Sequence, residues 1–360
     1  MKKNRLQSLD FLRAIAIVLV IFRHKYLYDF TVTLGWIGVD LFFVLSGFLV
    51  SGLLFREYKK HGNFKAKLFL IRRGFKIYPI YYLSFLFYLP YLFSKNSFNL
   101  NAIFNDLIFI QNYTNGWGYV YAASWSLAVE EHFYFSLCLV FSLILKYFPS
   151  VLIPLSKKLN LFEKGLILCL LMCLLFRVLF IYNNPEDVVR AFTMSHLRMD
   201  SLLFGVFISY WYYFKNEKIK AWFFRNKSIL AIVAFGFLIF TPFIEPLTSF
   251  YVKTIGFTML YLSFGILLLF ALFDKVLFSD LTKLIGAKSM KFICNIGFSS
   301  YSIYVIHTLV IYLIAKLNIE YRYLSFLLVL GLSIFAGILL TRTIESYFLR
   351  IRDRFYKSRY

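Results

Sequence analysis

The chain has 360 residues, of which 60% are hydrophobic and 21% aromatic, and its mean hydropathy is +0.70. Soluble globular domains are typically about 45–50% apolar, so this composition excludes a soluble globular protein and indicates a polytopic membrane protein. The net charge of +22 does not require a nucleic-acid partner, because Lys and Arg accumulate in the cytoplasmic loops of membrane proteins. The four cysteines lie in or beside apolar runs, so we expect neither a metal site nor a disulfide framework.

Ten apolar stretches are each about long enough to cross a bilayer, and such segments must be helical because the backbone has to satisfy its own hydrogen bonds in lipid. They cover residues 10–28, 36–55, 77–94, 125–146, 163–182, 197–214, 228–244, 250–273, 295–315 and 323–342. We therefore predict an all-α transmembrane helix bundle of about ten spans. Residues 1–360 are expected to form one domain without an appended soluble domain.

The basic residues predict how these spans are oriented. With a cytoplasmic N-terminus, the inner segments carry 30 of the 40 Lys and Arg residues and the outer segments carry 7. This asymmetry follows the positive-inside rule. We therefore predict a multi-pass protein of the inner or plasma membrane with both termini in the cytoplasm.

The first predicted span contains an arginine and a histidine within an otherwise apolar run. Arg13 and His24 are eleven residues apart, so a helix places both side chains on one face, separated by roughly 16 Å along its axis. This distance is about half the thickness of the hydrocarbon layer. A ligand that reaches from Arg13 toward His24 would therefore extend through the membrane.

A basic cluster precedes the third predicted span. The sequence IRRGFKIYP places Arg72, Arg73 and Lys76 at the cytoplasmic end of that span. Clustered guanidinium groups suit a phosphorylated ligand, because they form bidentate hydrogen bonds with phosphate. A patch that contacts lipid headgroups is the alternative, and the spacing alone favours it.

Further ionisable residues occur in other predicted spans, where they are costly and usually functional or paired. Most lie in the outer half of the membrane under the predicted topology. They are Asp40 in the second span, Glu130 and Glu131 in the fourth, Arg198 and Asp200 in the sixth, and His307 within the ninth. A lone histidine such as His307 is more often a hydrogen-bond partner between helices than a catalyst. The outer loop at residues 95–124 is rich in Asn, Tyr and Trp, which is typical of an interfacial aromatic belt or of a lid over an acceptor site.

These placements suggest group transfer to an alcohol, because a histidine with a carboxylate partner is suited to take a proton from a hydroxyl. The donor's phosphates would be held on the inner side, and the acceptor would arrive on the outer side. Hydride transfer is disfavoured because the chain has no glycine-rich dinucleotide motif.

The same motifs, in this order, resemble the acyltransferase 3 family of integral membrane acyltransferases, which includes bacterial O-acetyltransferases of surface glycans. The likeness spans nearly the whole chain, through the Arg13–His24 pattern, GWIGVDLFFVLSGFL, SWSLAVEEHFYF, RMDSLLFG, GFSSYSIYVIH and the closing Glu345 of IESYF. The third base of the family's RRxxR motif is Lys76 here. This lysine keeps the positive charge but not the bidentate geometry of arginine.

The resemblance implies that an acyl group, most often acetyl, passes from cytoplasmic acyl-CoA to a hydroxyl of an extracytoplasmic acceptor. That acceptor would be a cell-surface polysaccharide or a lipopolysaccharide sugar, or a lipid-linked saccharide. Acetyl-CoA would be a donor substrate, with no permanently bound cofactor, no metal and no nucleic-acid partner, and membrane lipids would surround the protein.

The resemblance also implies roles for individual residues. His24 would be the general base, and Glu130 would orient it or balance its charge. The donor's phosphates would meet Arg13, Arg72, Arg73 and Lys76. The residues expected to support the reaction or to face the acceptor are Asp40, Ser126, Glu131, Arg198, Asp200 and His307.

Two other functions remain open at this point. A transporter or flippase of a lipid-linked glycan would also place charges in the bundle, although it predicts inverted repeats, and the sequence shows none. An enzyme of the same fold that acylates a small cytoplasmic molecule would take its acceptor from the inner side. Direct transfer and an acyl-histidine intermediate are equally compatible with the sequence.

Overall fold

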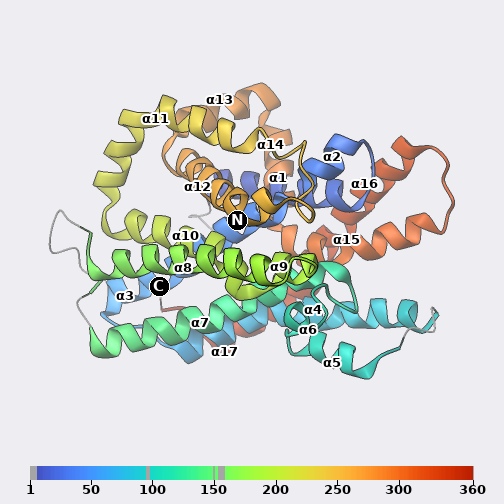
Figure 1. Ribbon diagram of the computed structural model, residues 1–360, viewed down its shortest axis with the longest axis horizontal. Helices are drawn as coiled ribbons and strands as arrows, with labels where there is room; N and C mark the ends of the chain where they lie inside the picture. The colour runs from blue at the N-terminus through green and yellow to red at the C-terminus, as the bar shows by residue number, and fades with distance from the viewer. Residues whose placement is uncertain (1–5, 95–97, 149–150, 153–158, 360) are drawn as a thin grey trace.

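The computed structural model describes residues 6–94, 98–148, 151–152 and 159–359. Over these residues the chain is helical and contains no β-strand, which confirms the predicted all-α class. In Figure 1 the helices α3, α7, α8 and α10 lie side by side, α11 to α14 cover one side of them, and α15 and α16 form one end of the molecule.

The first half of the chain contains α1 (Gln7–His24), α2 (Asp29–Gly35), α3 (Gly38–His61), α4 (Ala66–Ser94), α5 (Leu100–Leu107), α6 (Gln111–Thr114), η1 (Ala122–Ser124), α7 (Trp125–Tyr147) and α8 (Leu161–Asn183). The second half contains α9 (Val188–Thr193), α10 (Ser195–Phe214), α11 (Asn216–Leu238), η2 (Val252–Gly256), α12 (Phe257–Phe273), α13 (Lys275–Ile285), α14 (Ala287–Phe298), α15 (Ser300–Ala315), α16 (Arg322–Leu340), η3 (Thr341–Glu345) and α17 (Ser346–Phe355). The segment η1 is a 3₁₀ turn, whereas η2 and η3 are π-helical turns inside longer helices.

Six helical stretches of the described chain are long and apolar enough to cross a membrane, namely Asp29–His61, Ala122–Tyr147, Leu161–Asn183, Asn216–Leu238, Val252–Phe273 and Arg322–Phe355. The helices α14 and α15 meet at a bend of 77° and together form a seventh candidate. The helices α1, α4 and α10 correspond to three more of the predicted spans, but α1 contains three charged residues, and α4 and α10 contain charged residues and several tyrosines. The prediction of ten spans is therefore not confirmed, and the cytoplasmic position of both termini stays a prediction.

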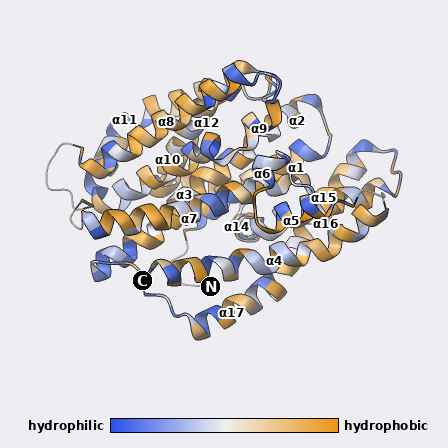
Figure 2. Cartoon of the chain, turned by 60° about the horizontal axis from the view of Figure 1, so that its bottom comes forward, coloured by the Kyte–Doolittle hydropathy of each residue, from blue (hydrophilic) through white to orange (hydrophobic). Residues whose placement is uncertain are grey.

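The outward faces of these helices are apolar, as expected for a surface in contact with lipid. On α8 the side chains of Leu168, Leu171, Leu175 and Leu179 are exposed, although such residues are normally buried in soluble proteins. Figure 2 shows the hydrophobic colour along α7, α8 and α16, with hydrophilic residues concentrated at helix ends and loops. This distribution indicates a multi-pass membrane protein.

Helix α1 lies between two apolar cores. Its residues Leu12 and Ala16 pack in a core built mainly by α3, α7, α10 and α12. Its residues Ile17 and Val20 pack in a second core, which α4, α15 and α16 complete. Polar side chains on the remaining surface of α1 are therefore held at the boundary between the two cores.

Glycines allow the inner helices to approach one another closely. A Cβ atom at Gly47 of α3 would lie 1.9 Å from the carbonyl oxygen of Leu202 on α10, and one at Gly205 of α10 would lie 2.3 Å from that of Val44. Small residues of this kind let helix backbones touch in membrane proteins. The α3–α10 contact is thus fixed by backbone-to-backbone packing.

The loop that precedes α7 is anchored by a buried aspartate. Asp106 is fully buried, and its two carboxylate oxygens accept hydrogen bonds from the backbone amides of Tyr119 (3.1 Å) and Val120 (2.7 Å). Burial raises the pKa of the Asp106 carboxyl to about 6, although the two hydrogen bonds oppose that shift. The anchor places the loop residues just before α7 against the bundle.

The α3–α10 contact generates the first prediction. We expect Gly205→Ala to destabilise the protein by about 1–3 kcal/mol, because the added methyl group forces the two backbones apart. The melting temperature of the purified protein in detergent measures this effect. Gly331→Ala on α16 is the matched control, because a Cβ atom there meets no atom within 4 Å. Equal melting temperatures of the two variants would contradict the role assigned to this contact.

The Asp106 anchor generates a prediction about pH. Because the folded pKa lies above the ordinary value of 3.8, the carboxyl favours the folded loop most below that value, and this contribution is lost as the pH rises through about 6. The change is at most roughly 3 kcal/mol. Hydrogen exchange at the amides of Tyr119 and Val120, corrected for intrinsic rates, should show protection falling across this window. Asp106→Asn removes the titrating group, so a pH dependence that persists in this variant would assign the effect to another residue.

Candidate functional site

Three cavities lie along α1, and neighbouring cavities share lining residues. The basic cavity, of about 250 Å³, contains Arg13 and the cluster at the start of α4. The central cavity, of about 120 Å³, shares Arg13, Arg73 and Lys76 with it. The histidine cavity, of about 60 Å³, contains His24 and shares Val39 and Tyr304 with the central cavity. The three cavities therefore lie next to one another, in order from the basic cluster to His24.

The basic cavity carries a net formal charge of +4 from six basic and two acidic residues. These are Arg13, Arg72, Arg73, Lys76, Arg352 and Arg359, with Glu57 and Glu345. The motif IRRGFKIYP supplies three of the six bases, α1 supplies Arg13, and the C-terminal segment adds the other two. This excess of cations makes the cavity suited to an anionic ligand.

The π-helical turn η3 places Glu345 in the wall of the basic cavity. The carboxylate of Glu345 is buried, forms an ion pair with Lys76 and accepts a hydrogen bond from Ser302 (3.3 Å). Ser302 in turn accepts a hydrogen bond from Thr341, at the start of the same turn (2.8 Å). Irregular turns of this kind often occur at functional sites. Glu345 thus holds the ammonium group of Lys76 at the boundary with the central cavity.

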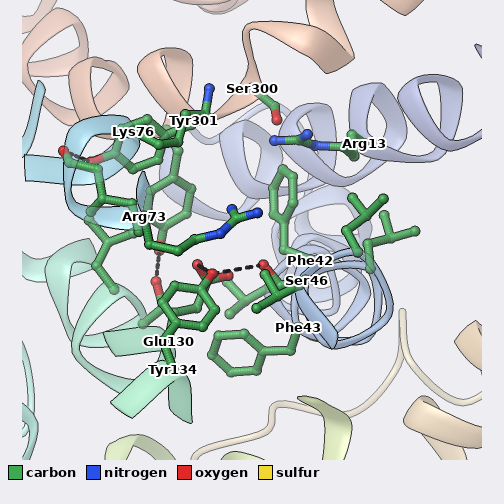
Figure 3. Close-up of a pocket in the computed structure, with 18 residues that line it drawn as sticks. Arg13, Phe42, Phe43, Ser46, Arg73, Lys76, Glu130, Tyr134, Ser300 and Tyr301 are labelled. Atoms are coloured by element: carbon green, nitrogen blue, oxygen red, sulfur yellow. Dashed lines mark hydrogen bonds between the residues drawn. The ribbon is translucent and has the colours of Figure 1, made fainter. Parts of the chain in front are cut away.

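Figure 3 shows the central cavity, with Arg73 extending into its middle and Arg13 pointing toward it from α1. On the α7 side, the hydroxyl of Tyr134 donates a hydrogen bond to Glu130 (2.7 Å) and lies 3.2 Å from the hydroxyl of Ser46. Glu130 interacts electrostatically with both arginines. The structure therefore places Glu130 beside the predicted donor-binding arginines, and its hydrogen-bond partner is Tyr134 rather than His24.

The adjacent glutamate points elsewhere. Glu131 is buried and accepts a hydrogen bond from the hydroxyl of Tyr78 on α4 (2.9 Å), and it does not line any of the three cavities. Successive residues of a helix point about 100° apart, so only one of the pair can face the cavity. Ser126, one turn earlier on α7, does line the central cavity and is hydrogen-bonded to the hydroxyl of Tyr304 (2.6 Å).

The ring of His24 lies beside the ring of a second histidine. The Nε2 atom of His307, on α15, lies 3.3 Å from Nδ1 of His24, and the two ring centroids are 5.0 Å apart. Nδ1 of His24 also lies 2.9 Å from the carbonyl oxygen of Val20, and Nδ1 of His307 lies 2.5 Å from that of Tyr304. Sequence reasoning included His307 among the supporting residues but did not pair it with His24.

This geometry selects one arrangement of protons for two neutral rings. Each Nδ1 atom faces a carbonyl oxygen, which accepts hydrogen bonds only, so each Nδ1 carries the proton. His307 then presents an unprotonated Nε2 that accepts a hydrogen bond from Nδ1–H of His24. The Nε2 atom of His24 is consequently left unprotonated, as a general base requires.

Asp40, Arg198 and Asp200 lie outside the three cavities, in a buried network that ties α3, α8 and α10 together. Arg198 forms an ion pair with Asp40 (2.9 Å), and Arg177 forms one with Asp200 (2.6 Å). The guanidinium group of Arg198 also stacks on the ring of Phe257 at 3.5 Å from its centroid. All four charged side chains are at most 1% exposed. Sequence reasoning assigned no role to Arg177, although its place inside an apolar run marked it as a residue that needs a partner.

Aromatic side chains form much of the wall of the histidine cavity, which includes Trp36, Trp117, Trp125 and Phe192. The rings of Trp117, Trp125 and Phe192 pack against one another with centroids 5.4–6.0 Å apart. Trp117 comes from the loop that Asp106 anchors. The loop predicted as a belt or a lid therefore contributes directly to the cavity that holds His24.

Comparison with known proteins gives a consistent assignment. A family model described as an acyltransferase domain, that of acyltransferase 3, matches residues 6–342. The peptidoglycan O-acetyltransferase OatA of Listeria monocytogenes is 26% identical over 321 residues, which cover 83% of this chain and 48% of that protein. The O-acetyltransferase OatA of Staphylococcus aureus (strain NCTC 8325 / PS 47) is 26% identical over 319 residues, covering 84% of this chain and 50% of that protein.

A further Staphylococcus aureus protein (strain COL), provisionally named an O-acetyltransferase, is 29% identical over 225 residues, which cover 58% of this chain and 35% of that protein. The chain thus spans between a third and a half of the length of these relatives. No significant match to a solved structure was found. The family model covers nearly all of the chain, and the chain therefore belongs to the acyltransferase 3 family.

Proposed function

We propose that this protein transfers an acetyl group from acetyl-CoA to a hydroxyl of an extracytoplasmic glycan. The observation that carries the proposal is the series of neighbouring cavities from the basic cluster to His24. Relatives named O-acetyltransferases, one of them of peptidoglycan, support both the reaction and a cell-wall polymer as acceptor.

The cavities suit the shape and charge of acetyl-CoA. Its phosphates would bind in the basic cavity, where arginine forms bidentate, charge-assisted hydrogen bonds with phosphate oxygens. Its uncharged pantetheine arm would pass through the central cavity between α1, α3 and α7. Glu130 would balance the charge of Arg13 and Arg73 there, so that the arm does not lie against uncompensated cations.

In the reaction that we propose, Nε2 of His24 takes the proton from the acceptor hydroxyl while the oxygen attacks the thioester carbonyl. The tetrahedral intermediate then collapses, the carbon–sulfur bond breaks, and His24 returns the proton to the departing CoA thiolate. His307 accepts a hydrogen bond from Nδ1–H of His24 throughout. It therefore orients the ring and stabilises the imidazolium that forms, as a third group does in other nucleophile–base pairs.

The acceptor would bind against the aromatic wall of the histidine cavity. The indole rings of Trp36, Trp117 and Trp125 suit the apolar C–H face of a sugar ring. The loop that supplies Trp117 lies on the outer side in the predicted topology. An acceptor that enters there would meet the thioester at His24 from the side opposite to the donor.

The first test measures CoA release from acetyl-CoA by protein in membranes, with and without a peptidoglycan or surface-glycan acceptor. We expect acceptor-dependent turnover by the wild type and a loss of about 10²–10⁴-fold in His24→Ala, because general base catalysis is removed. His196→Ala is the matched control, because His196 is hydrogen-bonded to Tyr113 and lines none of the three cavities. Undiminished turnover in His24→Ala would assign the base to another residue, and no wild-type turnover with any acyl-CoA would contradict the proposal.

A second test examines the positioning role of His307. We expect His307→Leu to lower kcat by about 10- to 100-fold with little change in KM for acetyl-CoA, because Nδ1–H of His24 loses one of its two acceptors and keeps only the carbonyl oxygen of Val20. His307→Gln should recover part of this loss, since its side-chain oxygen also accepts a hydrogen bond from Nδ1–H of His24. If His307→Leu and His307→Gln lower kcat by the same factor, or if either variant raises KM, His307 contributes to packing and does not orient His24.

A further inference from the structure

The basic residues of the entrance divide into an inner and an outer group. Arg13, Arg73 and Lys76 line both the basic and the central cavity, so they lie where the two meet. The outer arginines, Arg72, Arg352 and Arg359, line the basic cavity alone. The inner group therefore lies closer to His24 along the proposed donor path.

The C-terminal segment closes the outer part of this cavity. Arg72 forms an ion pair with Asp353 on α17 (3.1 Å) and donates a hydrogen bond to the carbonyl oxygen of Tyr356. Beyond α17, Arg359 forms an ion pair with Glu57 on α3 (2.7 Å) and donates a hydrogen bond to the side chain of Asn63 (3.2 Å). These contacts tie the C-terminal segment to α3 and α4 on both sides of the cavity, which fixes Arg352 and Arg359 in its wall.

We propose that the outer arginines bind the 3′-phosphate of the CoA nucleotide, so that the C-terminal segment makes the enzyme selective for acyl-CoA over acyl-phosphopantetheine carriers. The inference rests on the proposed function. CoA is a linear molecule whose thioester and 3′-phosphate lie at opposite ends. When the thioester reaches His24, the pyrophosphate falls at the inner bases and the 3′-phosphate at the outer arginines.

Shielding from solvent separates the outer arginines from the other arginines of α17. The side chains of Arg72, Arg352 and Arg359 are only 11%, 15% and 22% exposed. Arg350 and Arg354, on the same turns of α17, are exposed and do not line the cavity. A patch that served lipid headgroups would use the exposed bases, whereas a ligand inside the cavity uses the shielded ones.

A phosphate group can replace Asp353, the acidic partner that Arg72 and Arg352 share. Asp353 is 43% exposed and contacts both Arg72 (3.1 Å) and Arg352 (2.9 Å). A phosphate group offers the same bidentate geometry to guanidinium groups and carries more charge than this carboxylate. The 3′-phosphate therefore takes the place of Asp353 between two arginines that are already paired with an anion.

The test compares acetyl-CoA with acetyl-3′-dephospho-CoA as donors for the wild type, Arg352→Ala, Arg359→Ala and the exposed control Arg354→Ala. We expect the wild type and the control to lose about 10- to 100-fold in kcat/KM without the 3′-phosphate, mostly through KM, as for the loss of a charge-assisted hydrogen bond. With acetyl-CoA as the donor, kcat/KM of Arg352→Ala and of Arg359→Ala should be lower than that of the wild type by a similar factor. Removal of the 3′-phosphate from the donor should lower kcat/KM of these two variants little further. Arg352→Lys, which keeps the charge, should be intermediate.

A binding measurement accompanies the kinetics and does not depend on turnover. Adenosine 3′,5′-bisphosphate should raise the melting temperature of the detergent-solubilised wild type and of Arg354→Ala, and raise it less in Arg352→Ala. Melting temperatures without ligand show whether each variant is folded. No stabilisation of the wild type by this nucleotide would overturn the inference.

Three kinetic outcomes separate this inference from the proposed function. If the wild type uses both donors equally well, the 3′-phosphate is not recognised and the inference fails, while the acetyltransferase stands. If Arg352→Ala changes only the binding of anionic phospholipid vesicles, the outer arginines contact lipid and the inference also fails. If the wild type turns over neither donor, the proposed function fails and the inference with it.

Discussion

The packing of α14 against α1 is the contact on which the site depends. A Cβ atom at Gly297 of α14 would lie 1.7 Å from the carbonyl oxygen of Asp10 on α1, so only glycine permits the two backbones to touch there. Directly after this contact the chain bends by 77° into α15. The bend directs α15 along the C-terminal part of α1, where Tyr304 lines the cavity and His307 meets His24.

The buried charged side chains of the bundle have two kinds of surroundings. Arg198 and Arg177 are paired with aspartates and packed against aromatic rings, and they lie away from the cavities. Removing one partner would leave an uncompensated charge in the interior, so this network stabilises one arrangement of α3, α8 and α10. Arg13 and Arg73 instead face a cavity, with Glu130 as their neighbouring carboxylate. Paired burial thus marks a structural charge, and a charge that faces a cavity marks the candidate site.

The C-terminal segment has a larger part in the site than the family motifs indicate. The motifs end at Glu345, and this residue holds Lys76 at the junction of two cavities. The residues after Glu345 supply Arg352 from the short helix α17 and Arg359 from the segment that follows it. The segment is held by ion pairs with α3 and α4 and by the packing of Tyr356 against Phe75 of α4, so charges contribute to its position.

Much of this protein follows from the sequence because helical periodicity and the cost of burying polar groups act locally. The apolar runs determine an all-helical membrane protein, the interval of eleven residues puts Arg13 and His24 on one face, and IRRGFKIYP identifies the basic entrance. The sequence did not determine which distant residues meet. The pairing of Asp40 with Arg198 and of His24 with His307 depends on how helices cross and bend. These contacts join residues far apart in the chain, and no local pattern encodes them.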